Sequence, residues 1–255
     1  MLQPLLDKLE PSATIMRIGT TFAGKAVAYV LAVLVSLRLG IGLYAWDTAN
    51  RLEQPNFSVL CKLPGGVELR QYEPYLIAET EVASGPMRES TGKGFRTVAA
   101  YLFGKNKARG SGSEKMSMTA PVRSSSGGEK MSMTAPVRSS GGDKTKISFV
   151  MPSKYSMRTA PRPIDRAVRL RQVKPHFMAA RTFSGPPPGE ARVQREREKV
   201  LQALGDRSLR PEGDAETLVL GYHDPFMTPN FLRRNEVGIF VDGDSVRSAG
   251  LTSAA

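Results

Sequence analysis

The most apolar stretch of the chain lies near its N-terminus. Residues 26–46 carry almost only apolar side chains between Lys25 and Asp47, and a helix of this length can cross a hydrocarbon layer of roughly 30 Å. Arg38 interrupts the stretch, and a central arginine costs about 2.5–3.5 kcal/mol on insertion scales. We predict a transmembrane helix over 26–46, with a buried helix of the folded domain and a targeting peptide as the alternatives.

The polarity of the remaining residues divides the chain into further segments. Residues 1–25 precede the apolar stretch, and the polar residues 47–56 are predicted to form a linker. A folded domain is expected over 57–242, where apolar and polar positions alternate in short runs. The residues after it, 243–255, are mostly small and polar, which predicts a flexible tail.

Two periodicities predict the elements of this domain. Strand-like runs cover 57–63, 67–72, 75–82, 145–151, 167–174, 177–183, 217–222 and 236–241. Helical spacing of apolar residues predicts helices over 86–103 and 190–204. In the first of these helices, Phe95, Val98 and Leu102 recur on one face, which we expect to be buried.

One twelve-residue segment occurs twice. Residues 114–125 and 129–140 both read EKMSMTAPVRSS. Each copy alternates like a strand, and Pro121 and Pro136 should restrict each copy to a sheet edge or end its strand. The short connection between the copies predicts a hairpin, and the alternative is that one copy is a loop insertion.

The two halves of the domain resemble each other. Residues 67–78 align without gaps with 168–179, and six of the twelve positions are identical. Each of these segments is followed by a Gly- or Pro-containing turn and then by a predicted helix. This order predicts a pseudo-two-fold domain of two strand–strand–helix–strand units whose sheets close around one core.

Charge and composition exclude several classes of protein. The net charge of +12 is spread along the chain without a run of five basic residues, so we predict no nucleic-acid partner. Cys61 is the single cysteine, and His176 and His223 are the two histidines, which excludes an intrachain disulfide and a zinc site built from histidine and cysteine. The sequence contains no GxSxG, HExxH or P-loop motif, and we therefore predict that it is not an enzyme.

Several motifs together resemble one known family. They are VELRQYEPYLIAET (67–80), GFRTVAAYLFGKN (94–106), MSMTAPV (116–122 and 131–137), SFVMPSKY (148–155) and Pro229 with RRNEV (233–237). They resemble the SOUL haem-binding protein family over about 57–242, and the doubled segment is similar to plant and algal members. The resemblance implies an α+β fold, a distorted antiparallel β-barrel of two sheets with two flanking helices. It also implies binding of haem or related tetrapyrroles without catalysis.

A tetrapyrrole needs an apolar slot with cations at its mouth. The resemblance implies that the first helix and the adjoining sheet border this slot. The candidate contacts are Lys93, Phe95, Arg96, Ala99, Leu102, Met118 and Met133, and the candidate axial ligand of an iron is His176. The alternatives are a solvated helix face for the two cations, core packing for the methionines and a partly exposed strand histidine for His176.

These observations combine into one functional hypothesis. We predict a non-enzymatic carrier or buffer of haem or another tetrapyrrole, attached to a membrane through residues 26–46 in a single pass. A chloroplast membrane is one candidate location, and a cytoplasmic location is the alternative. Two other functions remain open: a membrane-tethered structural or interaction module that has lost its ligand, and an enzyme that acts on a tetrapyrrole. The sequence predicts no particular protein partner.

Overall fold

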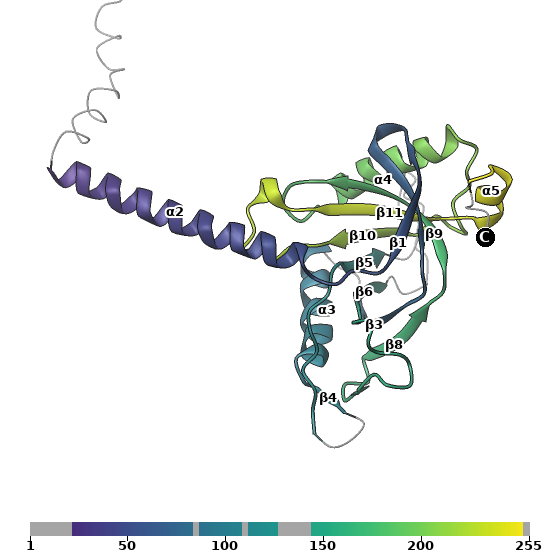
Figure 1. The fold of residues 1–255 in the computed structure, drawn as a ribbon, viewed down its shortest axis with the longest axis horizontal. Coiled ribbons are helices and arrows are strands. Elements are labelled where there is room, and N and C mark those ends of the chain that lie inside the picture. The colour runs from purple at the N-terminus through teal and green to yellow at the C-terminus, as the bar shows by residue number, and fades with distance from the viewer. Residues whose placement is uncertain (1–21, 84–86, 109–111, 127–143, 252–255) are drawn as a thin grey trace, which may run out of the picture.

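The computed structural model describes residues 22–83, 87–108, 112–126 and 144–251. Its first element is the long apolar helix α2 (Phe22–Asn50), which projects away from the rest of the chain (Figure 1). Residues 24–50 are long and apolar enough to cross a membrane. The helix continues four residues beyond the predicted end at residue 46, so the prediction of a linker from residue 47 was wrong over this part. An ion pair between Asp47 and Arg51 at 2.9 Å supports the additional turn.

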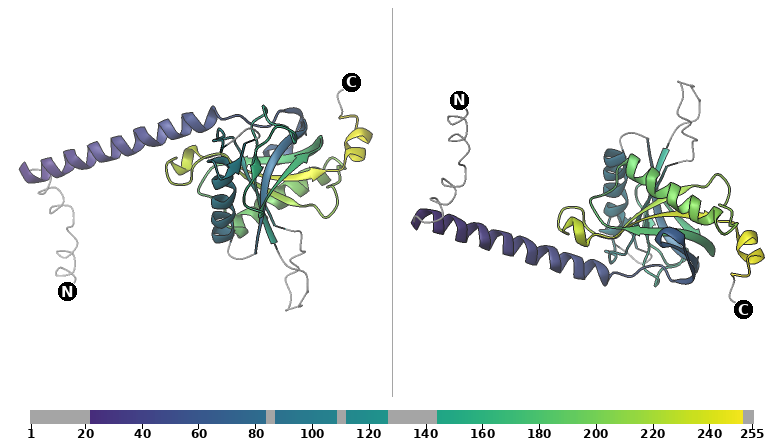
Figure 2. Two further views of the ribbon diagram at one scale, coloured as in Figure 1. Left: turned by 90° about the horizontal axis from the view of Figure 1, so that it is seen from below. Right: turned by 90° about the horizontal axis from the view of Figure 1, so that it is seen from above.

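The domain is built on one antiparallel sheet of nine strands in the order β1-β2-β9-β11-β10-β5-β6-β3-β8. The strands are β1 (Phe57–Leu63), β2 (Val67–Tyr72), β3 (Tyr75–Ala83), β5 (Val122–Ser126), β6 (Lys144–Val150), β8 (Val168–Val173), β9 (His176–Phe183), β10 (Thr217–Gly221) and β11 (Asn235–Val241). The sheet curls into a half-barrel (Figures 1 and 2). A second sheet pairs β4 (Asn106–Lys107) with β7 (Arg162–Pro163). The predicted α+β fold is confirmed.

The strand order is symmetric about the boundary between β10 and β5. On each side of this boundary three further strands follow in equivalent order, β11-β9-β2 and β6-β3-β8, and β1 is added at one edge. The register obeys the same symmetry, because Tyr72 pairs with His176 and the equivalent Val173 pairs with Tyr75. The pseudo-two-fold repeat predicted from residues 67–78 and 168–179 is therefore present in the sheet.

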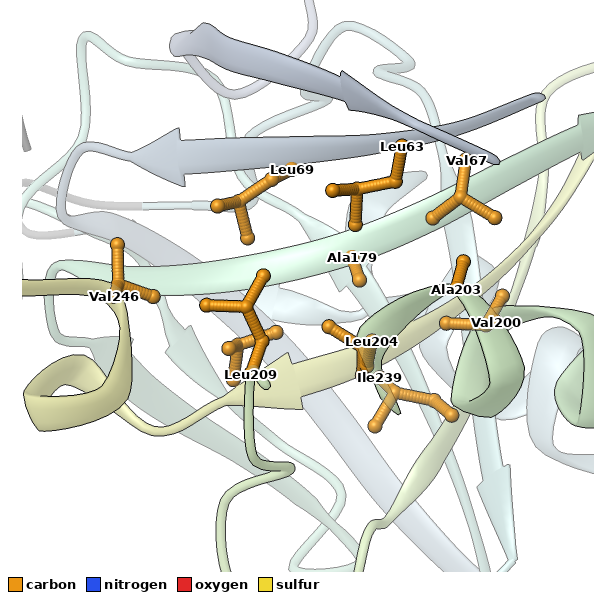
Figure 3. Packing of buried hydrophobic residues seen from close by; sticks show 11 residues of the cluster. Leu63, Val67, Leu69, Ala179, Val200, Ala203, Leu204, Leu209, Ile239 and Val246 are labelled. Carbon is orange, nitrogen blue, oxygen red and sulfur yellow. The ribbon is translucent and has the colours of Figure 1, made fainter. Parts of the chain in front are cut away.

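Two helices cover the convex face of the half-barrel. Helix α4 (Glu190–Gly205) packs Val200, Ala203 and Leu204 against β2, β9 and β11 (Figure 3). Helix α3 (Met87–Leu102) packs against β3, β6 and β8 in a second apolar cluster. Gly94 allows a close approach there, because a Cβ atom at this position would lie 2.5 Å from Cγ1 of Ile147. These two clusters and a third one, which includes Tyr72, Met178 and Leu220, supply the core that the periodicities predicted.

The C-terminal segment is folded over part of its length. Asp242 accepts hydrogen bonds from the N–H groups of Asp244 and Ser245 and so caps the short helix α5 (Gly243–Ser248). Val246 is fully buried in the α4 cluster. The predicted flexible tail was therefore wrong for these residues, because the Asp242 cap and the buried side chains of Ser245 and Val246 order this short helix.

The doubled segment contributes one strand to the described structure. In the first copy the strand begins at Val122, after Pro121, and not at the methionines. Before it, the N–H of Ala120 donates to the carbonyl of Glu53, and the hydroxyl of Thr119 donates to the carbonyl of Val150. The second copy, 129–140, lies outside the described residues, so the predicted hairpin stays a prediction. Two short 3-10 turns complete the description, η2 (Pro64–Gly66) and η3 (Asn230–Leu232).

Candidate functional site

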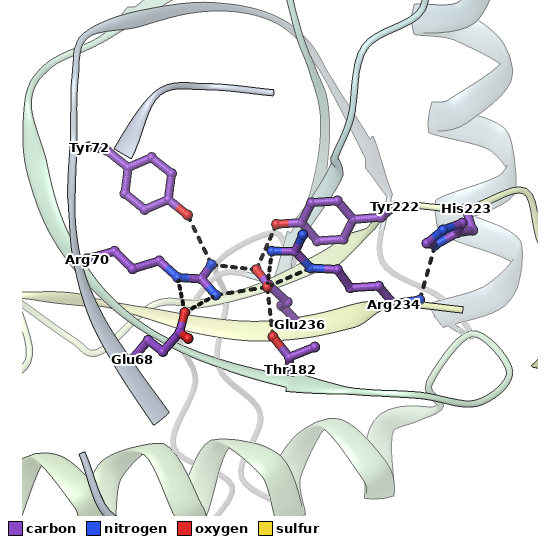
Figure 4. Close-up of polar contacts among 8 residues, drawn as sticks. All are labelled: Glu68, Arg70, Tyr72, Thr182, Tyr222, His223, Arg234 and Glu236. Carbon is purple, nitrogen blue, oxygen red and sulfur yellow. Dashed lines mark hydrogen bonds and ion pairs between the residues drawn. The ribbon is translucent and has the colours of Figure 1, made fainter. Parts of the chain in front are cut away.

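The concave face of the half-barrel carries a buried ion pair at its centre. Arg70 on β2 and Glu236 on β11 are 2 % and 0 % exposed. They form two parallel hydrogen bonds of 2.8 and 3.0 Å (Figure 4). Such a bidentate pair fixes geometry as well as charge, and here it connects strands that are 166 residues apart in the sequence.

Further donors surround the Glu236 carboxylate. It accepts hydrogen bonds from Tyr222 at 2.7 Å, from Thr182 at 2.9 Å and from two nitrogens of Arg234 at 3.0 and 2.7 Å. Burial alone would raise the pKa of Glu236, but the hydrogen bonds and charges of Arg70 and Arg234 lower it to about 2. The carboxylate is therefore ionised and saturated with donors, which suits a structural centre better than proton transfer.

An aromatic cluster lies beside this network. The His176 ring stacks on Tyr72 with 5.1 Å between centroids and 1° between planes. Phe240 contacts the same imidazole edge-on at 5.0 Å, and Tyr75 contacts it at 5.9 Å. These rings come from β9, β2, β11 and β3, so the strand order of the folded sheet brings the cluster together.

Hydrogen bonds distinguish the two histidines. Nδ1 of His176 lies 2.8 Å from the carbonyl oxygen of Lys174, which can only accept, so Nδ1 carries the proton. Nδ1 of His223 instead accepts from the N–H of Arg234 at 3.1 Å, which leaves the proton on Nε2. Burial lowers the pKa of both rings below the ordinary value of 6.5, so both rings are neutral at pH 7. Of the two, His176 therefore has an Nε2 lone pair, and this atom is buried without a partner among the described residues.

A cavity of about 380 Å³ opens on the concave face beside the aromatic cluster, within the size range of small-molecule sites. Its lining consists of Glu79, Arg123, Lys146, Ser148, Arg171, Val173, Glu216, Leu218 and Phe240. Three cations thus face two carboxylates. Arg171 is paired with Glu79 through bonds of 2.9 and 3.1 Å. Arg123 is 5 % exposed and donates to the neutral phenol of Tyr75 at 2.9 Å.

The structure places the predicted site residues on two faces of the sheet. Lys93, Phe95 and Arg96 are exposed on α3, and Phe95 contacts Phe149 at 5.1 Å between centroids. Ala99 and Leu102 are buried on the convex side, beneath α3, and Met118 packs against the same apolar cluster. Met133 lies outside the described residues. His176 faces the concave side, so α3 and the histidine do not form one site.

Sequence reasoning missed the cations of the concave face. Arg123, Lys146 and Arg171 lie on β5, β6 and β8, each next to at least one apolar residue of its strand. Alternation separates the two faces of each strand, but it does not tell which polar faces turn toward each other. A metal site made only of protein ligands is absent from the described part of the chain, where no three His, Cys, Asp or Glu side chains cluster suitably.

Comparison with known families decides the identity of the domain. Residues 52–240 match the model of the SOUL haem-binding protein family. The chain belongs to this family. The SOUL match begins before β1, ends one residue before the end of β11 and leaves out the whole of α2. At the level of the family it associates the chain with haem binding. No curated protein sequence matches this SOUL chain.

Solved structures similar to this SOUL chain have low sequence identity. A cryo-EM structure of an EcmrR–DNA complex has a TM-score of 0.50 and 8% identity, covering 94% of this chain and 84% of that chain. The crystal structure of the EcmrR C-terminal domain has a TM-score of 0.48 and 8% identity over 69% and 96% of the two chains. A hydrolase from Listeria innocua has a TM-score of 0.46 and 9% identity over 69% and 91%. At these identities the likeness concerns the fold alone.

Proposed function

We propose that this SOUL chain binds haem or a related tetrapyrrole on the concave face of its half-barrel and acts as a carrier or buffer at a membrane, without catalysing a reaction. The observation that carries the proposal is the buried Nε2 lone pair of His176, which lies in an aromatic cluster at the edge of a cationic cavity. This combination meets the separate needs of the ring, the carboxylates and the metal of such a ligand.

The aromatic and basic side chains suit the two chemically different parts of a tetrapyrrole. Its flat apolar ring stacks favourably on aromatic side chains, and Phe240 both lines the cavity and contacts His176. Its carboxylates are anions for which Arg123 and Lys146 are suitable donors. Arg171 is a weaker candidate, because its guanidinium is already paired with Glu79.

His176 is the residue that would hold an iron. A metal-binding histidine commonly donates its other ring N–H to a backbone carbonyl, which fixes the ring and leaves the ligating nitrogen unprotonated. The bond to the carbonyl of Lys174 provides this arrangement. Because Nε2 is buried, a macrocycle reaches it only if a packed ring such as Phe240 changes its rotamer. When bound, an iron porphyrin would supply its metal as the acceptor of this lone pair.

Helix α2 supports a position at a membrane. It is apolar over a length sufficient for a span, and most of its side chains are exposed. Free tetrapyrroles partition into membranes and are photoreactive, so a binding protein tethered to the membrane could sequester them where they accumulate. The chemistry of α2 suits a chloroplast membrane and any other membrane equally.

A second candidate function is a tethered interaction module that has lost its ligand. The observation in its favour is that the centre of the concave face is occupied by the buried pair of Arg70 and Glu236.

A second candidate location for a ligand is the outer surface of α3, where Phe95 is 37 % exposed beside Lys93 and Arg96. Both candidates can be separated from the main proposal in one series of titrations.

The experiment is a titration of the full chain in lipid nanodiscs with hemin and with protoporphyrin IX. We expect saturable one-to-one binding of both ligands, a loss of hemin affinity in His176→Ala, and a loss for both ligands in Arg123→Gln. A matched control combines Lys93→Ala with Arg96→Ala on α3 and should bind normally. Loss of binding in the α3 variant alone would move the site to that helix. Absence of saturable binding in the native chain would leave the interaction module.

A further inference from the structure

The loop between β10 and β11, residues 222–234, displays an apolar surface that the tetrapyrrole site does not use. Three of its side chains are unusually exposed: Phe226 at 73 %, Phe231 at 69 % and Met227 at 45 %. Single exposed apolar residues are ordinary on protein surfaces. Three large apolar side chains within six residues of one loop form an exposed apolar patch, and such patches mark protein or membrane interaction sites.

The backbone of this loop is held rigidly. The Asp224 carboxylate accepts from the N–H groups of Phe226 and Met227, both at 2.7 Å. From the other side, Arg233 donates to the carbonyl of Thr228 at 2.7 Å and also to the carbonyl of Pro225. These hydrogen bonds fix the backbone of the loop, although the Thr228 hydroxyl and His223 Nε2 are buried without a partner among the described residues. The phenyl rings of the loop are exposed outside this frame.

The same loop packs against helix α2. Arg38 donates to the carbonyl of Met227 at 2.8 Å and to the carbonyl of Phe226 at 2.7 Å. One turn further along α2, a Cβ atom at Gly42 would lie 2.7 Å from Cδ of Pro229. Both further views also show the loop beside the helix (Figure 2). The glycine thus permits a close contact, and the arginine provides two hydrogen bonds across it.

This contact explains how an arginine is accommodated in an apolar helix. A guanidinium in hydrocarbon is costly unless its donors are satisfied, and the two loop carbonyls satisfy part of them. Arg38 lies eight residues before Trp46, a residue type that prefers the membrane interface, which corresponds to about 12 Å along the helix axis. If α2 crosses the bilayer with Trp46 at the interface, the loop beside Arg38 lies below that level.

We infer that the β10–β11 loop inserts into the lipid bilayer beside α2 and forms a second membrane contact through Phe226, Met227 and Phe231. The inference rests on the proposed membrane span of α2. The occupant of the apolar patch is the acyl layer of the lipid, because the patch is continuous with the exposed apolar surface of α2. Two contacts fix the orientation of the domain, and they hold the loop-side ends of β10 and β11, at Gly221 and Asn235, close to the membrane.

The test uses tryptophan fluorescence of the full chain in phosphatidylcholine vesicles, with brominated lipid as quencher in the acyl layer and iodide as quencher in water. Trp46 is the single native tryptophan, so it reports on α2 in the native chain. In a Trp46→Phe background, Phe226→Trp reports on the loop. Ile164→Trp is the matched control, because Ile164 is 56 % exposed and follows β7, whose partner strand β4 lies away from α2 in Figure 1.

We expect brominated lipid to quench Phe226→Trp at least as strongly as native Trp46, and to leave Ile164→Trp unquenched. Quenching of Phe226→Trp by iodide alone, with Trp46 still quenched by the lipid, would overturn the inference and leave the membrane span intact. Protection of Phe226→Trp from both quenchers would also overturn it and indicate a contact between protein surfaces. Absence of lipid quenching at Trp46 would show that the proposed span itself fails, and the inference with it.

Discussion

The rings of Tyr72 and His176 lie parallel across β2 and β9, where the two residues are directly opposed in the register. The pseudo-two-fold symmetry places Val173 and Tyr75 at the equivalent positions of β8 and β3. The stacked pair thus exists in only one half of the sheet. The pseudo-symmetric sheet consequently carries an asymmetric aromatic cluster. Within this cluster, His176 is the residue whose side chain can bind a metal.

Replacing His176 with phenylalanine should preserve the ring packing and remove the buried Nε2 that has no partner. We expect the free energy of unfolding of His176→Phe to stay within about 1 kcal/mol of the native value. His176→Ala also removes the ring contacts and should lower the free energy of unfolding by about 3 kcal/mol. Urea unfolding of both variants measures the difference. Equal losses in the two variants would show that the hydrogen bond to Lys174 outweighs the ring packing.

The free energy of unfolding should depend on pH between neutrality and the acid range. Burial lowers the pKa of His176 below its ordinary value of 6.5, so the unfolded chain binds more protons than the folded chain between the two pKa values. Stability is therefore complete above about pH 7 and falls as the pH drops toward the folded pKa.

His176→Phe provides the control for this pH dependence. Its slope between pH 7 and the acid range should be smaller than that of the native chain. Part of the slope should remain, because burial also lowers the pKa of His223. Urea midpoints at a series of pH values measure both slopes, and identical slopes would exclude His176 as a contributor.

Replacing Glu236 with glutamine should destabilise the sheet strongly. Arg70 is 2 % exposed and would keep only the more exposed Glu68 as a charged partner, and breaking a buried pair costs about 3–5 kcal/mol. Glu79→Gln is the matched control, because its partner Arg171 has a side chain that is 52 % exposed, and such pairs contribute about 1 kcal/mol or less. Chemical denaturation of both variants is the measurement. A similar small loss in both would contradict the central role of the buried pair.

Two glycines of α3 should respond to alanine in opposite ways. A Cβ atom at Gly94 would lie 2.5 Å from Ile147, so Gly94→Ala should push α3 away from the sheet and cost about 1–3 kcal/mol. At Gly92 the nearest atom is the flexible end of Arg96 at 3.8 Å, so Gly92→Ala should gain up to about 1 kcal/mol of helix propensity. Thermal unfolding compares the two, and a stabilised Gly94→Ala would show that the helix can shift at no cost.

Much of the fold could be predicted because its signals are local. Alternation along 67–72 and 75–82 predicts strands without any knowledge of where these segments lie in the sheet. The spacing of Val98 and Leu102 predicts the buried face of α3. The short helix α5 escaped prediction, because its single buried apolar residue, Val246, shows no periodicity in a polar segment. Its burial depends on the α4 cluster, which is assembled from distant parts of the chain.

The sequence by itself determined the apolar helix, most strands and the two long helices of the domain, the internal repeat and the membership in a haem-binding family. Only the tertiary structure decided which polar faces meet. Arg70 pairs with Glu236, and Arg38 donates hydrogen bonds to the carbonyls of Phe226 and Met227. The residues of each contact are more than 160 positions apart in the sequence. The physical reason is that side-chain period assigns a residue to a face of its own strand or helix, whereas strand order and register determine what lies opposite that face.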